Sequence, residues 1–501
     1  PIARQRSSRG HPAKAPLAKE PYTWTTYPER LEAAGVSWKI YEDMADNFGD
    51  NPLVGFKAFR DSLAKTPGSN PALAQKGLST QHLDVLRADI AAGSLPQVSW
   101  IISPAADSEH PGPSSPAQGA DYIARVLDCL TSNPDVWART ALLVMFDEND
   151  GYFDHVPPPA PPAKDATGKM LGGSTVDTAG EYHVMHAASE KTSERADLKE
   201  RPYGLGPRVP LYVISPFARR GYINSEVFDH TSVIRFCETR FGVTEPNISA
   251  WRRAVCGDLT SCFDFKTPNA AVAKLPDTTD TAKRAAALPG RTKPPTPTEP
   301  VAPVQAAGLR RSRPLPYALD AALTGNSPPR IVFRNTGSAS AVFHVYNRLA
   351  LAAPPRRYTV EPGKMLQDEW QTGAYDLVVH GPNGFHRHFA SQKGGAGPLV
   401  TLVAVGRKLQ LRLANPEKIS RSVVVASEPY AADLAAWTAQ LGPEGSANHL
   451  WDLSTTSGWY DLTVTIEGTP GWRQRFAGRV DTGVATMTDP ALGGAAILSW
   501  S

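Results

Sequence analysis

A proline-rich segment divides this chain into two parts with different hydrophobic patterns, and the division limits the folds open to it. Residues 266–315 are dense in Pro, Thr, Ala and Lys, which is the composition of a linker. Before the linker, short apolar runs alternate with helical patterns. After it, short stretches alternate apolar and polar residues. The sequence therefore predicts an α/β region at residues 22–265 and an all-β region beyond residue 315.

The region at residues 22–265 contains apolar runs of strand length separated by helical patterns. Such an alternation predicts a mostly parallel sheet with helices on both faces. Three of the strands end in polar loops, and in a parallel sheet these loops share one edge. The predicted strands are 36–41, 98–102, 140–146 and 209–215, and the predicted helices include 117–130 and 231–241.

The strand at 140–146 ends in the acidic sequence DENDG at residues 147–151. Carboxylates this close repel one another and are costly to desolvate, so a partner must neutralise them. A divalent cation fits, because such ions prefer hard oxygen ligands. The alternative is a solvated acidic turn, and we interpret Asn149 and Asp150 as turn formers around Gly151. The position at a strand end favours a metal site.

Further titratable side chains follow two of the predicted strands. Because the carboxyl ends of parallel strands meet at one edge, we expect these side chains to converge. A histidine pair farther along, His183 and His186, stands in a polar loop and is interpreted as solvated. The side chains expected to converge are Glu109, His110, Asp147, Glu148, Asp150, Asp154 and His155.

The all-β region contains an internal repeat. GAYDLVV at residues 373–379 matches GWYDLTV at residues 458–464. Regularly spaced short strands predict two related β-sandwich-like modules, at residues 316–405 and 406–501. Titratable groups are not concentrated in either module. A binding or spacer role and a role in supporting the first domain both remain open.

Composition and charge exclude several classes of protein. The net charge of +3, from 52 basic and 49 acidic residues, argues against a dedicated nucleic-acid surface. No apolar run approaches the ~18 residues of a transmembrane segment. Residues 1–21 are basic and aperiodic, so we expect them to be disordered. Four cysteines are too few for a disulfide scaffold, although Cys256 and Cys262 are close enough in sequence to bridge in an oxidising compartment.

Several longer motifs carry a resemblance to a known family. SEHP at 108–111, DENDGYFDHVPPP at 147–159, RVPLYVISPF at 208–217 and FDHTSVIRFCETRFGV at 228–243 resemble the bacterial phosphoesterase family. That family contains the non-haemolytic and haemolytic phospholipases C and a related acid phosphatase. The motifs TTYPERLE and WRRAVCGDL, together with the two C-terminal repeats, resemble its phospholipase C branch.

The resemblance implies an alkaline-phosphatase-like α/β core and a metal-assisted attack on phosphorus by a side-chain hydroxyl. Asp147 and Glu148 resemble ligands of one divalent metal ion, whose identity the sequence does not give. His110 resembles the histidine that faces the phosphoryl or leaving group. Asp154 and His155 belong to the same motif as the carboxylates and are candidate catalytic residues. The family's ENRSFDHYFG-like metal motif and the nucleophile after it do not occur in this sequence, which indicates the C-terminal part of a longer enzyme.

The function implied by the resemblance is phospholipase C-type hydrolysis of phosphatidylcholine-like phospholipids to diacylglycerol and phosphocholine. The expected partners are a phospholipid substrate and a membrane surface contacted peripherally, and the expected location is secreted or periplasmic. One alternative is a phosphomonoesterase of the acid phosphatase type, against which the tandem C-terminal modules argue. The other is an inactive remnant that acts only as a binding module, which the missing motif favours.

Overall fold

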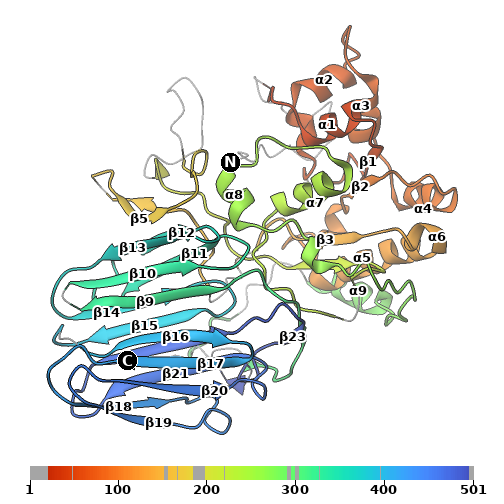
Figure 1. The fold of residues 1–501 in the computed structure, drawn as a ribbon. Coiled ribbons are helices and arrows are strands. Elements are labelled where there is room, and N and C mark those ends of the chain that lie inside the picture. Colours follow the sequence, from red (N-terminus) through yellow and green to blue (C-terminus); the bar gives the residue numbers. More distant parts are fainter. Residues whose placement is uncertain are drawn as a thin grey trace.

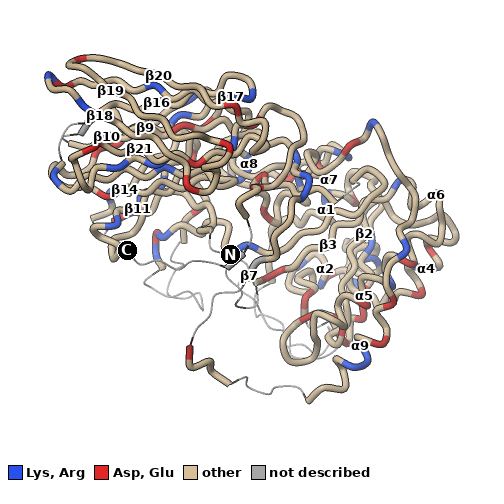
Figure 2. Tube along the Cα trace, turned by 90° about the horizontal axis from the view of Figure 1, so that it is seen from below, with Lys and Arg blue, Asp and Glu red and all other residues tan. Residues whose placement is uncertain are grey.

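The computed structural model shows an α/β region followed by a β-sandwich region, as the sequence predicts (Figure 1). Basic side chains (Lys and Arg) and acidic side chains (Asp and Glu) are interspersed along both regions, and neither kind is concentrated in one region (Figure 2). The structure describes residues 21–47, 49–149, 151, 156–165, 167–183, 198–218, 221–289, 295–299, 304–326, 328–394, 397–492 and 494–495.

The α/β region begins with a capped helix that turns into a buried strand. At the start of α1 (Tyr27–Ala33) the backbone N–H of Thr26 donates to Glu29 Oε2 at 2.8 Å, which completes a capping box. Gly35 follows with φ 71°, and the chain then enters β1 (Trp38–Tyr41). β1 pairs in parallel with β2 (Val98–Ile101).

Helices cover both faces of these strands. After α1, the helices of the α/β region are α2 (Lys57–Leu63), α3 (Pro71–Gly77), α4 (Leu83–Ala91), α5 (Pro116–Thr131), α6 (Pro134–Trp137), α7 (Thr231–Phe241) and α8 (Ala250–Val255). Of these, α8 packs against Val342 of the sandwich and not on these strands. On one face, α4, α5 and α6 form a cluster with Tyr41. On the other face, Trp38 and Ile40 pack with α1, α2, α3 and α7. Helices on both faces are therefore confirmed.

The pairing of β3 (Leu142–Met145) with β6 (Leu211–Ile214) corrects one expectation. The two strands are antiparallel, with Leu142 opposite Ile214. The loop after β6 therefore lies at the opposite end from the DENDG loop, so the prediction that all three strand-end loops share one edge is wrong. Periodicity in the sequence does not specify strand direction, and the long connection between these strands permits either one.

The C-terminal region is a sandwich in which each repeat contributes strands to both layers. The ten-stranded layer has the order β19-β18-β21-β22-β15-β14-β11-β12-β5-β4, and the facing layer consists of β13-β10-β9 and β16-β17-β20. β15 and β22 follow the matching GAYDLVV and GWYDLTV strands of the two repeats. They pair antiparallel with His388 opposite Arg475, which joins the repeats into one sheet.

The strands of the sandwich are short, as predicted. They are β9 (Leu319–Asn326), β10 (Pro329–Asn335), β11 (Ala341–Asn347), β12 (Arg356–Val360), β13 (Met365–Glu369), β14 (Tyr375–His380), β15 (His386–Ser391), β16 (Leu399–Val405), β17 (Lys408–Ala414), β18 (Arg421–Ala426), β19 (Trp437–Leu441), β20 (Ser446–Asp452), β21 (Trp459–Ile466) and β22 (Arg473–Arg479). β16 pairs with β17 of the second repeat, although the module boundary was expected after residue 405.

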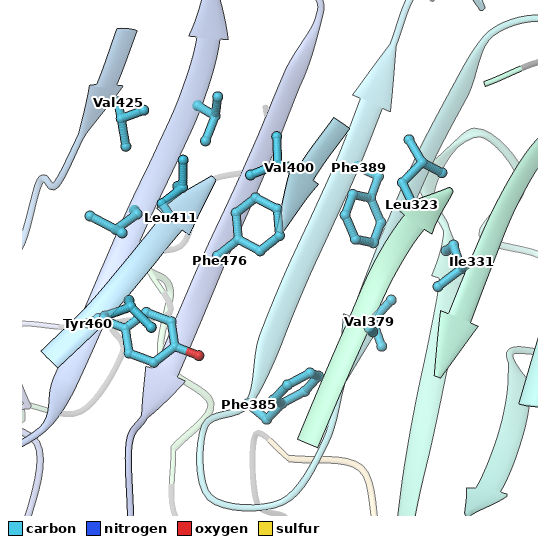
Figure 3. Close-up of a cluster of buried hydrophobic side chains, with 14 of the residues drawn as sticks. Leu323, Ile331, Val379, Phe385, Phe389, Val400, Leu411, Val425, Tyr460 and Phe476 are labelled. Atoms are coloured by element: carbon cyan, nitrogen blue, oxygen red, sulfur yellow. The ribbon is translucent and has the colours of Figure 1, made fainter. Parts of the chain in front are cut away.

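One hydrophobic core extends through both repeats. Figure 3 shows side chains of the first repeat, such as Leu323 and Phe389, in the same cluster as Phe476 of the second. Alternate residues of each strand point into this cluster, which is the pattern of a sheet with one face in a core. The two modules therefore depend on each other for burial.

The α/β region is attached to the sandwich through strands and a buried tryptophan. The hairpin of β4 (Ala163–Lys164) and β5 (Met170–Ser174) extends the ten-stranded sheet, because β5 pairs in parallel with β12. A Cβ at Gly172 would lie 1.9 Å from the carbonyl oxygen of Arg357, so only glycine permits this pairing. Trp251 of α8 is fully buried, and its Nε1 donates to Thr359 Oγ1 at 2.9 Å.

The segment expected to be a linker contains ordered elements. Helix α9 (Thr279–Ala286) follows Thr278, whose Oγ1 donates to Asp121 Oδ1 of α5 at 2.8 Å. The short strands are β7 (Val304–Gln305), which pairs with β24 (Gly494–Ala495), and β8 (Arg311–Ser312), which pairs with β23 (Thr486–Met487). All four cysteines, including Cys256 and Cys262, are thiols in the structure. No helix in the described part of the chain could cross a membrane.

Candidate functional site

The loop after β2 holds Glu109 and His110 in a hydrogen-bonded turn. The backbone N–H of Glu109 donates to Ser114 Oγ at 3.1 Å, and that of His110 donates to Ser108 Oγ at 3.2 Å. Glu109 has φ 64°, in the left-handed region that side chains rarely adopt. These bonds compensate for the strained backbone. The position of His110 is therefore set by the turn.

Helix α5 leaves room for this turn through a glycine. A Cβ added at Gly119 would lie 2.2 Å from Cγ of Glu109. The Glu109 side chain therefore lies directly against the α5 backbone. Glycine is needed at this helix position although it costs about 1 kcal/mol relative to alanine in a helix interior.

The carboxylates predicted as metal ligands lie directly after β3. Asp147 is exposed, and Glu148 is half-buried. Their donor chemistry suits a hard divalent cation. In the described part of the chain, however, no three His, Cys, Asp or Glu side chains are grouped so that they could hold a metal ion. The described residues therefore do not form a complete metal site.

Three of the residues expected to converge with these carboxylates, Asp150, Asp154 and His155, lie outside the described residues, as does His186. β2 and β3 contact the same hydrophobic cluster, through Ile101 and Leu142. The loops that carry His110 and Asp147 therefore follow strands of one helix-covered layer.

His230 is a residue at this site to which the sequence reasoning assigned no role. Its Nε2 lies 3.0 Å from the carbonyl oxygen of Phe146, the residue before Asp147. Because a carbonyl oxygen only accepts, Nε2 donates this bond. The start of α7 is thereby tied to the end of β3. The sequence signal that points to His230 is the motif FDHTS at residues 228–232, which is part of the resemblance to the family but does not show what His230 contacts.

A buried ion network positions the residue next to His230. Arg252 of α8 donates from Nη1 to Asp229 Oδ2 at 2.7 Å and from Nε to Glu181 Oε1 at 2.9 Å. Asp229 in turn accepts the backbone N–H of Thr231 at 3.0 Å, which begins α7. Burial lowers the pKa of Arg252, but the two carboxylates outweigh that effect and hold the pKa above its usual value.

The fold and these loops define a class of protein. The chain combines an α/β core that carries carboxylates at a strand end with a sandwich of two repeats, and comparison with known families assigns both parts. Residues 5–244 match the Phosphoesterase family, and residues 311–391 and 397–479 each match the bacterial phospholipase C, C-terminal domain.

Known relatives identify the branch. The chain is 45% identical to the non-hemolytic phospholipase C of Pseudomonas aeruginosa, over 97% of this chain and 70% of the relative. It is 41% identical to the non-hemolytic phospholipase C of Burkholderia pseudomallei and 38% identical to the hemolytic phospholipase C of P. aeruginosa, in both cases over 94% of this chain and 70% of the relative. The chain belongs to the bacterial phosphoesterase family, in its phospholipase C branch.

Proposed function

We propose that this protein functions in phospholipase C-type hydrolysis of phosphatidylcholine-like phospholipids, releasing diacylglycerol and phosphocholine. The observation that supports this function is the 45% identity over nearly the whole chain to a phospholipase C, which includes both the α/β region and the repeats. The reaction breaks the bond between phosphorus and the glycerol oxygen. A phospholipid substrate also fits a secreted or periplasmic location, which we propose for this protein.

The residues proposed for this chemistry lie in the loops after β2 and β3. Asp147 and Glu148 would supply two ligands to one divalent cation, which neutralises charge on a phosphoryl oxygen when it is bound. His110 would protonate the departing glycerol oxygen. Asp154 and His155 remain candidate catalytic residues. The rest of the metal coordination does not come from the described residues, so we assign no reaction step to the ion.

An assay with two chromogenic substrates tests this function. The protein in its full length, as its gene encodes it, is expected to hydrolyse a nitrophenyl phosphocholine diester faster than nitrophenyl phosphate. Asp147→Ala should lower diester turnover at least about tenfold, and should leave the melting temperature unchanged because Asp147 is exposed. Asp433→Ala, which removes an exposed carboxylate of the sandwich, is the matched control.

The same assay discriminates the alternatives. Faster turnover of the monoester would favour a phosphomonoesterase. Absence of turnover with both substrates would favour the binding module. Equal activity of Asp147→Ala and the unmodified chain would remove Asp147 from the site.

A loop of the sandwich supports the proposed membrane contact. All residues of the run RLALAAP, from Arg348 to Pro354, are exposed between β11 and β12, with Leu349 at 60% and Leu351 at 69%. The corresponding loop of the second repeat, between β18 and β19, instead buries Leu434 to 1%. A long exposed apolar run is tolerated mainly where it contacts another phase or molecule. We propose that this loop enters a phospholipid surface.

Replacing both leucines is expected to weaken membrane binding. Leu349→Asp/Leu351→Asp should lower the affinity for phosphatidylcholine vesicles at least about tenfold, because burying each leucine contributes about 1.5–3 kcal/mol. Co-sedimentation with vesicles measures this. Leu288→Asp alters an equally exposed leucine outside the sandwich and should bind like the unmodified chain. Equal binding by all three proteins would contradict the proposed contact.

A further inference from the structure

Basic side chains form a row across four neighbouring strands of the ten-stranded sheet. This basic row consists of Arg357 of β12, His344 of β11, His380 of β14 and His386 of β15, each directly opposite the next. Phe343 and Val345, on either side of His344, belong to the hydrophobic core, so the basic row lies on the other face of the sheet. Strand pairing brings these residues together, which is why the sequence showed no concentration of titratable groups here.

Three members of the basic row carry polar atoms without a hydrogen-bond partner in the part of the chain that the structure describes. Both ring nitrogens of His344 are buried and unbonded, and so are Nε2 of His386 and Nε of Arg357. Only 3% of His344 is exposed. Buried polar atoms in folded proteins are normally hydrogen-bonded. These atoms are therefore suited to receive a ligand.

The charge of the basic row is not balanced by the carboxylates on the same face, which bond to other side chains. Asp376 accepts from Nε2 of His388, and Asp461 pairs with Arg475. Burial lowers the pKa of Arg357, and the groups that oppose this effect are two tyrosines rather than carboxylates. A cation would be repelled by the guanidinium, whereas an anion would be attracted. The basic row therefore fits an anionic ligand.

We propose that the basic row binds a phosphate group, held mainly by Arg357 and His344. The planar guanidinium matches the spacing of phosphate oxygens, and such charge-assisted bonds are strong. A neutral imidazole supplies one further N–H donor. Residues directly opposite on paired strands have Cβ atoms about 4.5–5.5 Å apart, so one tetrahedral phosphate can bridge two members of the row.

The residues at the two ends of the basic row leave space for a ligand. Gly172 of β5 lies opposite Arg357, and Ala477 of β22 lies opposite His386. Neither has a side chain larger than a methyl group. His386 and its neighbour His380 are half-buried, so the row is open to solvent at this end although His344 is buried.

The position of the basic row indicates two sources for the phosphate. β11 and β12 are joined by the RLALAAP loop, for which we propose membrane contact. His344 precedes the first residue of this loop by four positions, about 13 Å along a strand. One source is therefore the headgroup of a phospholipid that the loop contacts. The other is a water-soluble phosphate ester such as phosphocholine. Binding of the phosphate group itself does not rest on the proposed function.

Titration calorimetry of the full-length protein with inorganic phosphate tests the binding. Arg357→Met should weaken the affinity of one phosphate per chain at least about tenfold, because it removes the charged donor. Phosphate bound at the candidate active site would not respond to this substitution. Arg412→Met is the matched control, because Arg412 is an exposed arginine of β17 in the facing layer and donates to Gln410. It should bind phosphate like the unmodified protein.

Thermal unfolding separates a binding role of Arg357 from a structural one. Without phosphate, Arg357→Met should unfold at the same temperature as the unmodified protein or higher, because it removes a buried charge. Phosphate should raise the melting temperature of the unmodified protein more than that of the variant. A lower melting temperature of Arg357→Met together with unchanged phosphate affinity would overturn the proposal. If this variant does not fold, His344→Phe, which keeps an aromatic ring, provides the same comparison.

Co-sedimentation with phosphatidylcholine vesicles distinguishes the two sources. Every protein in this experiment carries Asp147→Ala to slow hydrolysis of the lipid. A loss of vesicle affinity of at least about tenfold in Arg357→Met would assign the basic row to a lipid headgroup. Unchanged vesicle affinity, with calorimetric binding of phosphocholine lost in Arg357→Met, would assign it to a soluble ester. Unchanged binding of phosphate, phosphocholine and vesicles by Arg357→Met would overturn the proposal.

Discussion

Replacing Arg252 by methionine is expected to lower the free energy of unfolding by about 3–5 kcal/mol. The reason is that Glu181 and Asp229, with only 3% and 5% of their side chains exposed, would remain as buried charges without their cation. Arg252 also donates from Nη2 to the carbonyl oxygen of Gly204 at 2.9 Å, and that bond would be lost as well. Urea unfolding followed by circular dichroism measures the change.

A surface ion pair provides the control for Arg252. Arg330 and Glu369 pair on the sandwich with 47% of each side chain exposed. Arg330→Met should therefore cost no more than about 1 kcal/mol. The double variant Arg252→Met/Glu181→Gln should recover part of the lost unfolding free energy, because it removes one of the two buried carboxylates that Arg252→Met leaves without a cation. Equal losses in Arg252→Met and Arg330→Met would show that burial does not control the effect.

The elements that could be predicted from the sequence are those with a complete local signal. Helix α7 has an apolar period and ends at Gly242, whose φ of 71° closes the helix as expected of a glycine at that position. The strands of the two repeats were visible as alternating stretches. The direction of β6 was not predictable, because alternation and apolarity are the same in either direction.

The candidate site was predictable only in part, for a related reason. The position of Asp147 and Glu148 after a strand follows from local sequence. The bond of His230 joins it to a backbone carbonyl 84 residues away, and a carbonyl leaves no signature in the sequence. The partners of Arg252 are 71 and 23 residues distant, so the charges were visible but their pairing was not.

A row of basic residues crosses the ten-stranded sheet on the face opposite the hydrophobic core. Arg357 of β12, His344 of β11, His380 of β14 and His386 of β15 lie directly opposite one another on successive strands. Burial, Arg357 and His380 lower the pKa of His344 to about 3. Burial and His380, with smaller contributions from Arg475, His388 and Arg387, lower the pKa of His386 to about 3. Both histidines are therefore neutral in the folded protein at neutral pH.

Acid is consequently expected to destabilise the sandwich. Unfolded histidine takes up its proton near pH 6.5, whereas folded His344 and His386 do so only near pH 3. Between these values the unfolded chain binds more protons, so stability falls as the pH falls. Each histidine contributes a slope of up to about 1.4 kcal/mol per pH unit. Their contribution is fully present above pH 6.5 and levels off below about pH 3.

Substitution isolates this contribution from the carboxylates that titrate in the same range. His344→Phe removes the titrating group and keeps an aromatic ring, so its unfolding free energy should fall less steeply between pH 6.5 and 4, by up to about 1.4 kcal/mol per unit. His82→Phe alters an exposed histidine and should follow the unmodified chain. Parallel curves for His344→Phe and the unmodified chain would contradict the assignment. Because the row lies on the sheet that joins both repeats, its protonation acts on the shared sheet as a whole.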